Sequence, residues 1–153
     1  MTYFDSGYLA KCYLDEDASA EVRSLARDRG QIACSEYGRM ELHAALHRKL
    51  REGWITRAQL TVLFRQLDLD EEDKLWTWLP LTERVMPEVA FAFRGLPDSV
   101  FLRTGDAVHL VTARANALSE IWSGDLRLLS AAPYFGLVGR SIDANPARPE
   151  AGP

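Results

Sequence analysis

The sequence predicts an α/β domain with a parallel central sheet flanked by helices on both faces. Short apolar runs, typical of buried strands, alternate with longer segments of helical periodicity along the chain. Strands that alternate with helices in this way form parallel sheets covered on both sides. At 153 residues the chain is long enough for one such domain, which would bury about two-thirds of its unfolded surface.

The individual elements follow from apolar periodicity and from capping residues. Strands are expected at residues 3–4, 31–34, 75–79, 120–123 and 136–142. Helices are expected from the first strand to residue 14 and at 18–29, 35–52, 56–69, 82–93, 105–118 and 126–132. Ser35 and Thr82 are expected N-caps, and Thr56 with Gln59 fits a capping box.

Composition excludes several classes of protein. With 47% hydrophobic residues, 26% charged residues and a net charge of −4, the chain is neither disordered nor collagen-like. Cys12 and Cys34 are isolated, so neither a disulfide framework nor a zinc site is indicated. No apolar run approaches a membrane span and no secretory signal opens the chain, so we expect a cytoplasmic protein without a membrane partner. Residues 1–142 are expected to form the single domain, and the proline-containing residues 143–153 a disordered tail.

Four acidic residues fall where a parallel sheet binds ligands. Asp5 directly follows the first strand, and Asp125 follows the fourth strand through one glycine. Asp106 heads the apolar face of a helix, and Glu41 has small neighbours on its own helix. Ligands of open parallel sheets bind outside the carboxyl ends of the strands. Carboxylates gathered there would repel one another unless a cation were bound, and an oxygen-only ligand set selects Mg²⁺ or Mn²⁺.

Other interpretations of these acids remain open. Asp5, Asp106 and Asp125 all lie near helix N-termini, where carboxylates commonly cap free N–H groups. Glu41 alone reads as a solvated helix residue. The chain would then be a non-catalytic binding module. A phosphatase of the haloacid-dehalogenase type would instead need a second aspartate two residues after Asp5, where this chain has Gly7.

Two further features also keep two interpretations each. His109 lies three residues after Asp106, so it either orients a carboxylate or is a satisfied core histidine. The predicted helix at 56–69 is apolar at nearly every angle, which suits a partner groove or the inner core. The apolar residues concerned are Leu60, Val62, Leu63, Phe64 and Leu67.

Four short motifs occur in order over residues 2–142. They are Tyr3-Phe4-Asp5-Ser6-Gly7-Tyr8-Leu9, Ser35 with Met40-Glu41-Leu42, Leu102-Arg103-Thr104-Gly105-Asp106-Ala107-Val108-His109-Leu110, and Ser123-Gly124-Asp125 with Leu128 and Ala131-Ala132. In order and spacing they resemble PIN domains, and among these the VapC-type toxins of toxin–antitoxin pairs. The closing Gly136-Leu137-Val138 run is similar to the last strand of that family. Gly7 departs from the small polar residue that the family often has there.

The resemblance implies a metal-dependent endoribonuclease that hydrolyses phosphodiester bonds in RNA. Its catalytic metal ligands, for Mg²⁺ with Mn²⁺ as the alternative, would be Asp5, Glu41, Asp106 and Asp125, supported by Ser6 and Ser123. The substrate should be single-stranded or looped RNA, because a recessed acid cluster does not easily reach a phosphate in a stiff duplex. Flanking phosphates would be held by Arg39, Arg48, Arg103 and Arg127. The resemblance also implies a cognate antitoxin protein and a homodimer.

Overall fold

The computed structural model describes residues 1–142, in which five strands form one parallel sheet. The strand order is β3-β2-β1-β4-β5, and every neighbouring pair is parallel. The strands are β1 (Thr2–Phe4), β2 (Ile32–Ser35), β3 (Trp76–Leu79), β4 (Glu120–Trp122) and β5 (Val138–Arg140). The predicted fold class is confirmed. The predicted tail, residues 143–153, lies outside the described residues.

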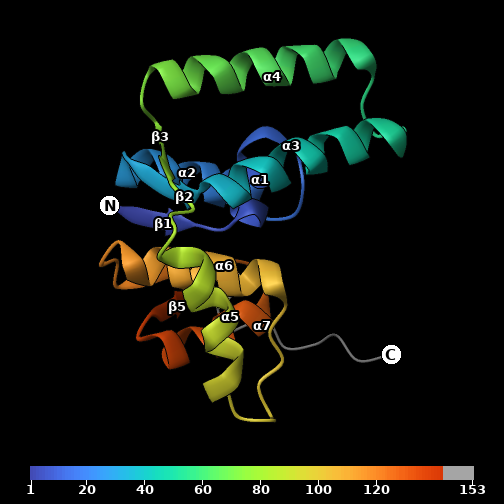
Figure 1. Cartoon of the computed structure of the whole chain (residues 1–153). Coiled ribbons are helices and arrows are strands. Elements are labelled where there is room, and N and C mark those ends of the chain that lie inside the picture. Colours follow the sequence, from blue (N-terminus) through green and yellow to red (C-terminus); the bar gives the residue numbers. More distant parts are fainter. Residues whose placement is uncertain (143–153) are drawn as a thin grey trace, which may run out of the picture.

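Helices cover both sides of the sheet (Figure 1). They are α1 (Ser6–Tyr13), α2 (Ser19–Arg29), α3 (Glu36–Arg51), α4 (Arg57–Glu72), α5 (Val85–Gly95), α6 (Thr104–Ala115) and α7 (Leu126–Ala131), followed by a 3₁₀ turn (Ala132–Phe135). In Figure 1, α1, α2 and α3 lie above β1 and β2, α5 and α6 lie below them, and α4 lies beyond α3. Each predicted helix is present, with ends shifted by up to three residues. The sixth ends early because the chain turns at Ala117, whose φ is 55°.

The central strand β1 connects the two helical layers. Tyr3 and Phe4 are fully buried and point to opposite sides, as alternate residues of a strand must. Tyr3 meets His109 of α6, and Phe4 packs edge-to-face on Tyr8 of α1 with ring centroids 5.5 Å apart. Asp5 is the next residue, so the strand delivers its carboxylate to the edge of the sheet between these layers.

The predicted caps determine where α3 and α4 begin. The Ser35 hydroxyl accepts from the Gly38 N–H, and the Thr56–Gln59 capping box is complete. The prediction that Thr82 is an N-cap was wrong, because α5 begins three residues later and its N-cap is Arg84, although the Thr82 hydroxyl still accepts from the Val85 N–H. The apolar residues of α4 fit both the inner core and a partner surface. Leu60 and Leu67 are buried in the core. Leu63 and Phe64 are half-buried and Val62 is exposed.

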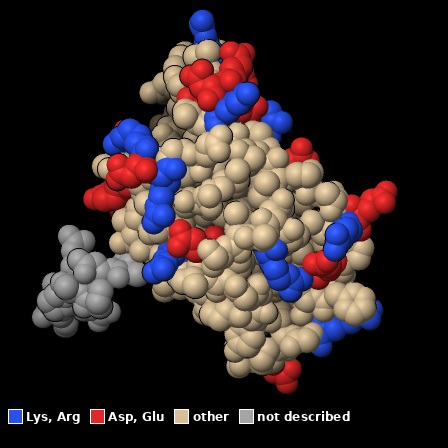
Figure 2. Space-filling view, turned by 90° about the vertical axis from the view of Figure 1, so that its left-hand side faces the viewer, with Lys and Arg blue, Asp and Glu red and all other residues tan. Residues whose placement is uncertain are grey.

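None of the helices within residues 1–142 is long and apolar enough to cross a bilayer. Figure 2 shows one face, on which Lys and Arg lie in small groups beside Asp and Glu around a largely uncharged centre. Charge is therefore mixed on this face, without a broad patch of one sign.

Close packing of β5 against α7 requires a glycine. A Cβ at Gly139 would lie 2.9 Å from the Leu129 carbonyl oxygen and 3.1 Å from the Leu129 Cα. We therefore expect Gly139→Ala to lower the free energy of unfolding by about 1–3 kcal/mol. Gly95→Ala is the matched control, because nothing lies within 4 Å of a Cβ there. Urea denaturation of both variants tests this packing, and equal stabilities would contradict it.

Candidate active site

A groove of about 1140 Å³ opens at the carboxyl edge of the sheet. Its walls come from α1, α3, α6, the β4–α7 turn and the start of α7. All four predicted carboxylates line it: Asp5, Glu41, Asp106 and Asp125. Asp5 and Asp125 meet there because β1 and β4 are parallel neighbours, so both residues follow carboxyl ends at one edge.

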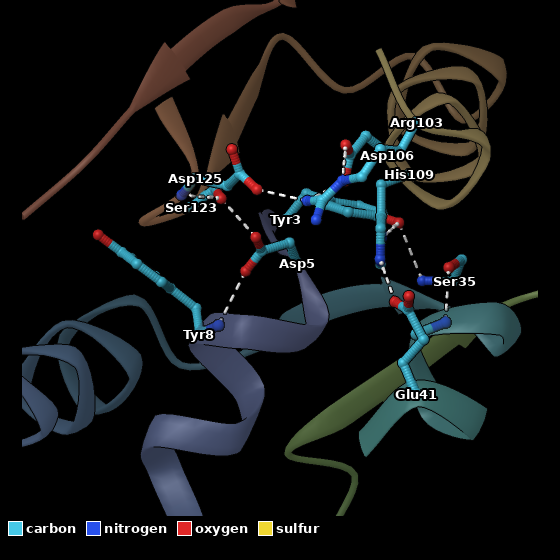
Figure 3. Close-up of polar contacts among 11 residues, drawn as sticks. Tyr3, Asp5, Tyr8, Ser35, Glu41, Arg103, Asp106, His109, Ser123 and Asp125 are labelled. Atoms are coloured by element: carbon cyan, nitrogen blue, oxygen red, sulfur yellow. Dashed lines mark hydrogen bonds and ion pairs between the residues drawn. The ribbon is translucent and has the colours of Figure 1, made fainter. Parts of the chain in front are cut away.

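Asp5 is the most enclosed carboxylate, 7% exposed. Its Oδ1 accepts from the Tyr8 N–H at 2.8 Å, and its Oδ2 accepts a short hydrogen bond from the Ser123 hydroxyl (Figure 3). Burial raises the pKa of Asp5 above its ordinary value, and the neighbouring His109 charge and these hydrogen bonds offset the lost hydration only in part. The charged form of Asp5 is thus costly in the folded protein.

Arg103 joins two of the other carboxylates. Its Nε donates to Asp106 Oδ2 at 2.8 Å and its Nη2 to Asp106 Oδ1 at 3.1 Å, while Nη2 also reaches Asp125 Oδ2 (Figure 3). Hydrogen bonding and charge attraction to Asp106 raise the pKa of Arg103 further above its usual range. Arg103 therefore neutralises part of the negative charge and ties the start of α6 to the start of α7.

Glu41 is held from the opposite wall by His109. The His109 Nε2 and Glu41 Oε2 are 2.9 Å apart. Burial would raise the pKa of Glu41, but hydrogen bonding and charge attraction from His109 and a hydrogen bond from Ser6 lower it overall. Burial likewise lowers the pKa of His109, but its contacts with Tyr3, Cys34 and Glu41 raise it well above the ordinary value. Glu41 is therefore ionised and anchored.

Capping accounts for two of the four carboxylates but uses only one oxygen of each. Asp5 caps α1, and Asp125 Oδ1 accepts from the Arg127 N–H at 2.8 Å to cap α7. Asp106 lies near the start of its helix, as predicted, but it is not the cap. The N-cap of α6 is Arg103, whose side chain makes no capping bond, and Asp106 lies in the first turn. Capping and a role in the groove are thus compatible, and capping cannot explain Asp106.

The structure brings three of the four predicted arginines to the groove. Arg48, Arg103 and Arg127 line it, whereas Arg39 does not. Arg39 forms a two-point ion pair with Glu71 of α4 at 2.9 and 2.6 Å and lies over the Trp78 ring. The expectation that Arg39 faces the site was therefore wrong, because its guanidinium is paired with Glu71, which lies 32 residues later in the sequence.

Three basic residues that the sequence prediction missed also line the groove. They are Lys11 of α1 and Lys49 and Arg51 of α3. The two α3 residues lie beside Arg48 in the last turn of that helix. Three bases in the final turn of a helix were a usable signal, although a cation there also suits the helix dipole.

The four carboxylates share the groove but do not form a preformed metal site. Within residues 1–142, no three His, Cys, Asp or Glu side chains form a ready metal-binding group. In this structure Arg103 is hydrogen-bonded to Asp106 and Asp125, and His109 to Glu41. The groove's acidic donors are all carboxylate oxygens, which hard divalent cations prefer, and a cation would favour the ionised form of the buried Asp5. The donor set fits Mg²⁺ or Mn²⁺ in its chemistry.

Comparison with known proteins identifies the fold. No family model and no curated protein matches the sequence. Among solved structures, VapC20 of Mycobacterium tuberculosis, a sarcin-ricin loop cleaving toxin, matches with a TM-score of 0.68 at 11% identity over 86% of this chain and 95% of that chain. VapBC2 from Rickettsia felis, crystallised with a DNA fragment from its promoter, matches with a TM-score of 0.63 at 12% identity over 92% of this chain and 98% of that chain.

The chain has the PIN-like fold of VapC toxins. The predicted resemblance is confirmed at the level of the fold. At 11–12% identity the match concerns architecture. Fold alone does not determine chemistry, so the activity has to be argued from the groove of this PIN-like domain.

The raised pKa of Asp5 predicts how stability depends on pH in EDTA. Below the ordinary value of 3.8 the carboxyl is protonated in both folded and unfolded chains. As the pH rises, the unfolded chain ionises first, so the folded state loses stability until the pH passes the raised folded value. Asp5→Asn removes this loss, and its stability relative to wild type should increase between acidic and neutral pH.

Urea denaturation at several pH values measures this difference. Asp98→Asn is the control, because Asp98 is exposed and lies outside the groove. A difference between Asp5→Asn and wild type that does not change with pH would contradict the account of Asp5.

Proposed function

We propose that the protein is a metal-dependent endoribonuclease, the toxin component of a toxin–antitoxin pair. The observation that carries this proposal is the convergence of Asp5, Glu41, Asp106 and Asp125, from four separate parts of the chain, on one groove. The fold shared with VapC20, a sarcin-ricin loop cleaving toxin, adds support. One or two Mg²⁺ or Mn²⁺ ions held by these carboxylates would supply an activated water and neutralise charge on the phosphate.

The side chains of the groove would have different roles in metal and phosphate binding. Asp5 and Asp106 are the central ligands in this proposal, and Glu41 and Asp125 complete the set. Ser123 positions Asp5 through its hydroxyl, whereas the same oxygen accepts from the Asp125 N–H at 2.9 Å. Arg103, 53% exposed, has room to exchange its carboxylate partners for a phosphate oxygen.

The substrate would be a single-stranded or looped RNA laid along the groove. Basic side chains from different elements line the groove together with the acids: Arg103 directly before α6, Arg127 in α7, and Arg48 and Arg51 in α3. This arrangement suits a strand whose scissile phosphate meets the acids while its neighbours meet the bases. A recessed acid cluster of this kind favours a strand that can bend.

The toxin proposal includes a cognate antitoxin, a homodimer and action in the cytoplasm. The similarity to a VapBC2 chain supports the antitoxin. A second cleft of about 530 Å³ between α1 and α4 offers apolar surface for such a protein. Its lining includes Trp54 and Val62, which are 74% and 66% exposed. Apolar side chains this exposed are typical of surfaces that a partner covers.

A non-catalytic binding module is the second candidate. It is favoured by the capping roles of Asp5 and Asp125 and by the lack of a preformed metal group within residues 1–142. Such a module would bind Mg²⁺ no better than any acidic surface. Metal binding and cleavage therefore separate the two candidates.

Incubating total cellular RNA with the pure protein tests the nuclease proposal. We expect discrete products with Mg²⁺ or Mn²⁺ and none with EDTA, because the proposed hydrolysis needs a cation to activate the water and to neutralise charge on the phosphate. Asp5→Asn and Asp106→Asn should reduce cleavage to the EDTA level, and Asp98→Asn, which changes an exposed acid outside the groove, should cleave like wild type. Cleavage that survives in both groove variants would overturn the assignment. Absence of both cleavage and calorimetric Mn²⁺ binding would favour the binding module.

Arg48 supplies a separate test of the RNA path. Arg48→Ala in an Asp5→Asn background should weaken binding of a single-stranded RNA at low salt. It should also make the slope of log K against log salt shallower by about 0.7, the value for one lost phosphate contact. Arg65→Ala, at an exposed position of α4, is the control. Fluorescence anisotropy measures both, and identical slopes for Arg48→Ala and Arg65→Ala would contradict this path.

A further inference from the structure

A line of buried polar contacts runs from the central strand to the groove (Figure 3). The Ser35 N–H donates to the Tyr3 hydroxyl at 3.1 Å, and this hydroxyl lies 2.9 Å from His109 Nδ1. His109 Nε2 lies 2.9 Å from Glu41 Oε2. Groups on β2, β1, α6 and α3 are thus joined in sequence, although Tyr3 and His109 are 106 residues apart.

The hydrogen bond to Glu41 has a defined direction. The Glu41 carboxylate accepts only, so His109 Nε2 must carry the hydrogen. The hydroxyl of Tyr3 donates to Nδ1 of a neutral ring and accepts from a charged one. In both cases the ring is held at both nitrogens. Tyr3 is fully buried and His109 is 2% exposed, so water does not compete for the hydrogen bond between these two side chains.

Packing leaves the His109 ring one orientation. It meets Tyr3 edge-on at a centroid distance of 5.8 Å, and Tyr37 edge-on at 6.2 Å. On α3, a Cβ at Gly38 would lie 2.8 Å from His109 Cε1, closer than real contacts allow. The absence of a side chain at Gly38 therefore leaves room for the His109 ring, whose Nε2 faces Glu41.

Glu41 needs such an anchor more than the three aspartates do. Its side chain has one more rotatable bond, and 34% of it is exposed to the groove. The backbone N–H groups at helix starts that hold Asp5 and Asp125 are out of reach for a residue in the middle of α3. An unanchored glutamate there would sample several rotamers.

We propose that His109 is a positioning residue that holds the Glu41 carboxylate in the groove, with Tyr3 fixing the far side of its ring. The role of Glu41 in metal binding and cleavage rests on the function proposed above. Groups behind a metal ligand commonly change metal affinity or activity by 10–100-fold when removed. His109→Leu should therefore lose about 10–100-fold in Mn²⁺ affinity and in kcat, with KM for RNA little changed.

Two variants separate positioning from a general structural role. His109→Gln keeps an amide N–H that can reach Glu41, and it should restore part of the Mn²⁺ affinity that His109→Leu loses. Tyr3→Phe keeps the aromatic ring but removes the hydroxyl that contacts His109 Nδ1 and accepts from the Ser35 N–H, and it should cause a smaller loss of Mn²⁺ affinity. The control is His47→Leu, at an exposed position outside the groove on α3, the helix that carries Glu41. Calorimetry with Mn²⁺ and thermal unfolding are measured on every full-length variant.

The proposal is supported if the loss of Mn²⁺ affinity is largest for His109→Leu and smaller for Tyr3→Phe and His109→Gln, and if these losses do not follow the melting temperatures. A His109→Leu variant that is folded and binds Mn²⁺ like wild type overturns it. If His109→Leu fails to fold, Tyr3→Phe and His109→Gln take its place: a loss of Mn²⁺ affinity in these folded variants supports the proposal, and wild-type affinity in both overturns it.

A spectroscopic readout is independent of metal and RNA. In metal-free wild-type protein, NMR should show a hydrogen on His109 Nε2 and a Glu41 carboxyl carbon that shifts in His109→Gln but not in His47→Leu. If the wild type neither binds Mn²⁺ nor cleaves RNA, the proposed function fails, and this measurement still tests whether His109 holds Glu41. An unchanged Glu41 carboxyl signal in His109→Gln would overturn the positioning role itself.

Discussion

Mutual repulsion among four carboxylates at one edge of the sheet is the constraint on which this end of the molecule depends. Because β1 lies at the centre, Asp5 is placed in the middle of the edge, and the other three acids converge from α3, α6 and the β4–α7 turn. Like charges at such a site disfavour their ionised forms. The fold stabilises these carboxylates with three partners from different walls of the groove, namely Arg103, His109 and Ser123.

Each partner also connects two parts of the fold. Arg103 attracts Asp106 on its own helix and Asp125 at the start of α7. His109 reaches from α6 to Glu41 on α3, and Ser123 reaches from the end of β4 to Asp5. The elements that build the groove are therefore tied together by the same contacts that reduce its negative charge. Metal binding by Asp106 and Asp125, as proposed above, would therefore require Arg103 to release them.

Much of the fold and the location of the site could be predicted from local sequence. Strand and helix periodicity, the Ser35 cap and the Thr56 capping box depend on residues within a few positions of one another, and all are present. Asp5 and Asp125 were predictable because each follows a strand directly in a parallel sheet. Asp106 and Glu41 required helical position as well, which periodicity also supplied.

The pairing of long side chains could not be predicted in the same way. Arg39 is taken by Glu71, 32 residues away, and Arg103 reaches Asp125 across 22 residues. His109 meets Glu41 across 68 residues, so the sequence left it as either a core histidine or an orienting one. These contacts depend on how helices from different parts of the chain are placed, and flexible arginine side chains have several partners within reach.

The most direct test of the central claim is anomalous X-ray scattering from crystals grown with Mn²⁺. The account predicts a manganese peak in the groove, within bonding distance of Asp5 and Asp106, and an Arg103 guanidinium moved away from Asp106. A groove without manganese at concentrations that saturate calorimetric binding, or a peak only at other acidic residues, would contradict the claim that these carboxylates form a metal-dependent active site.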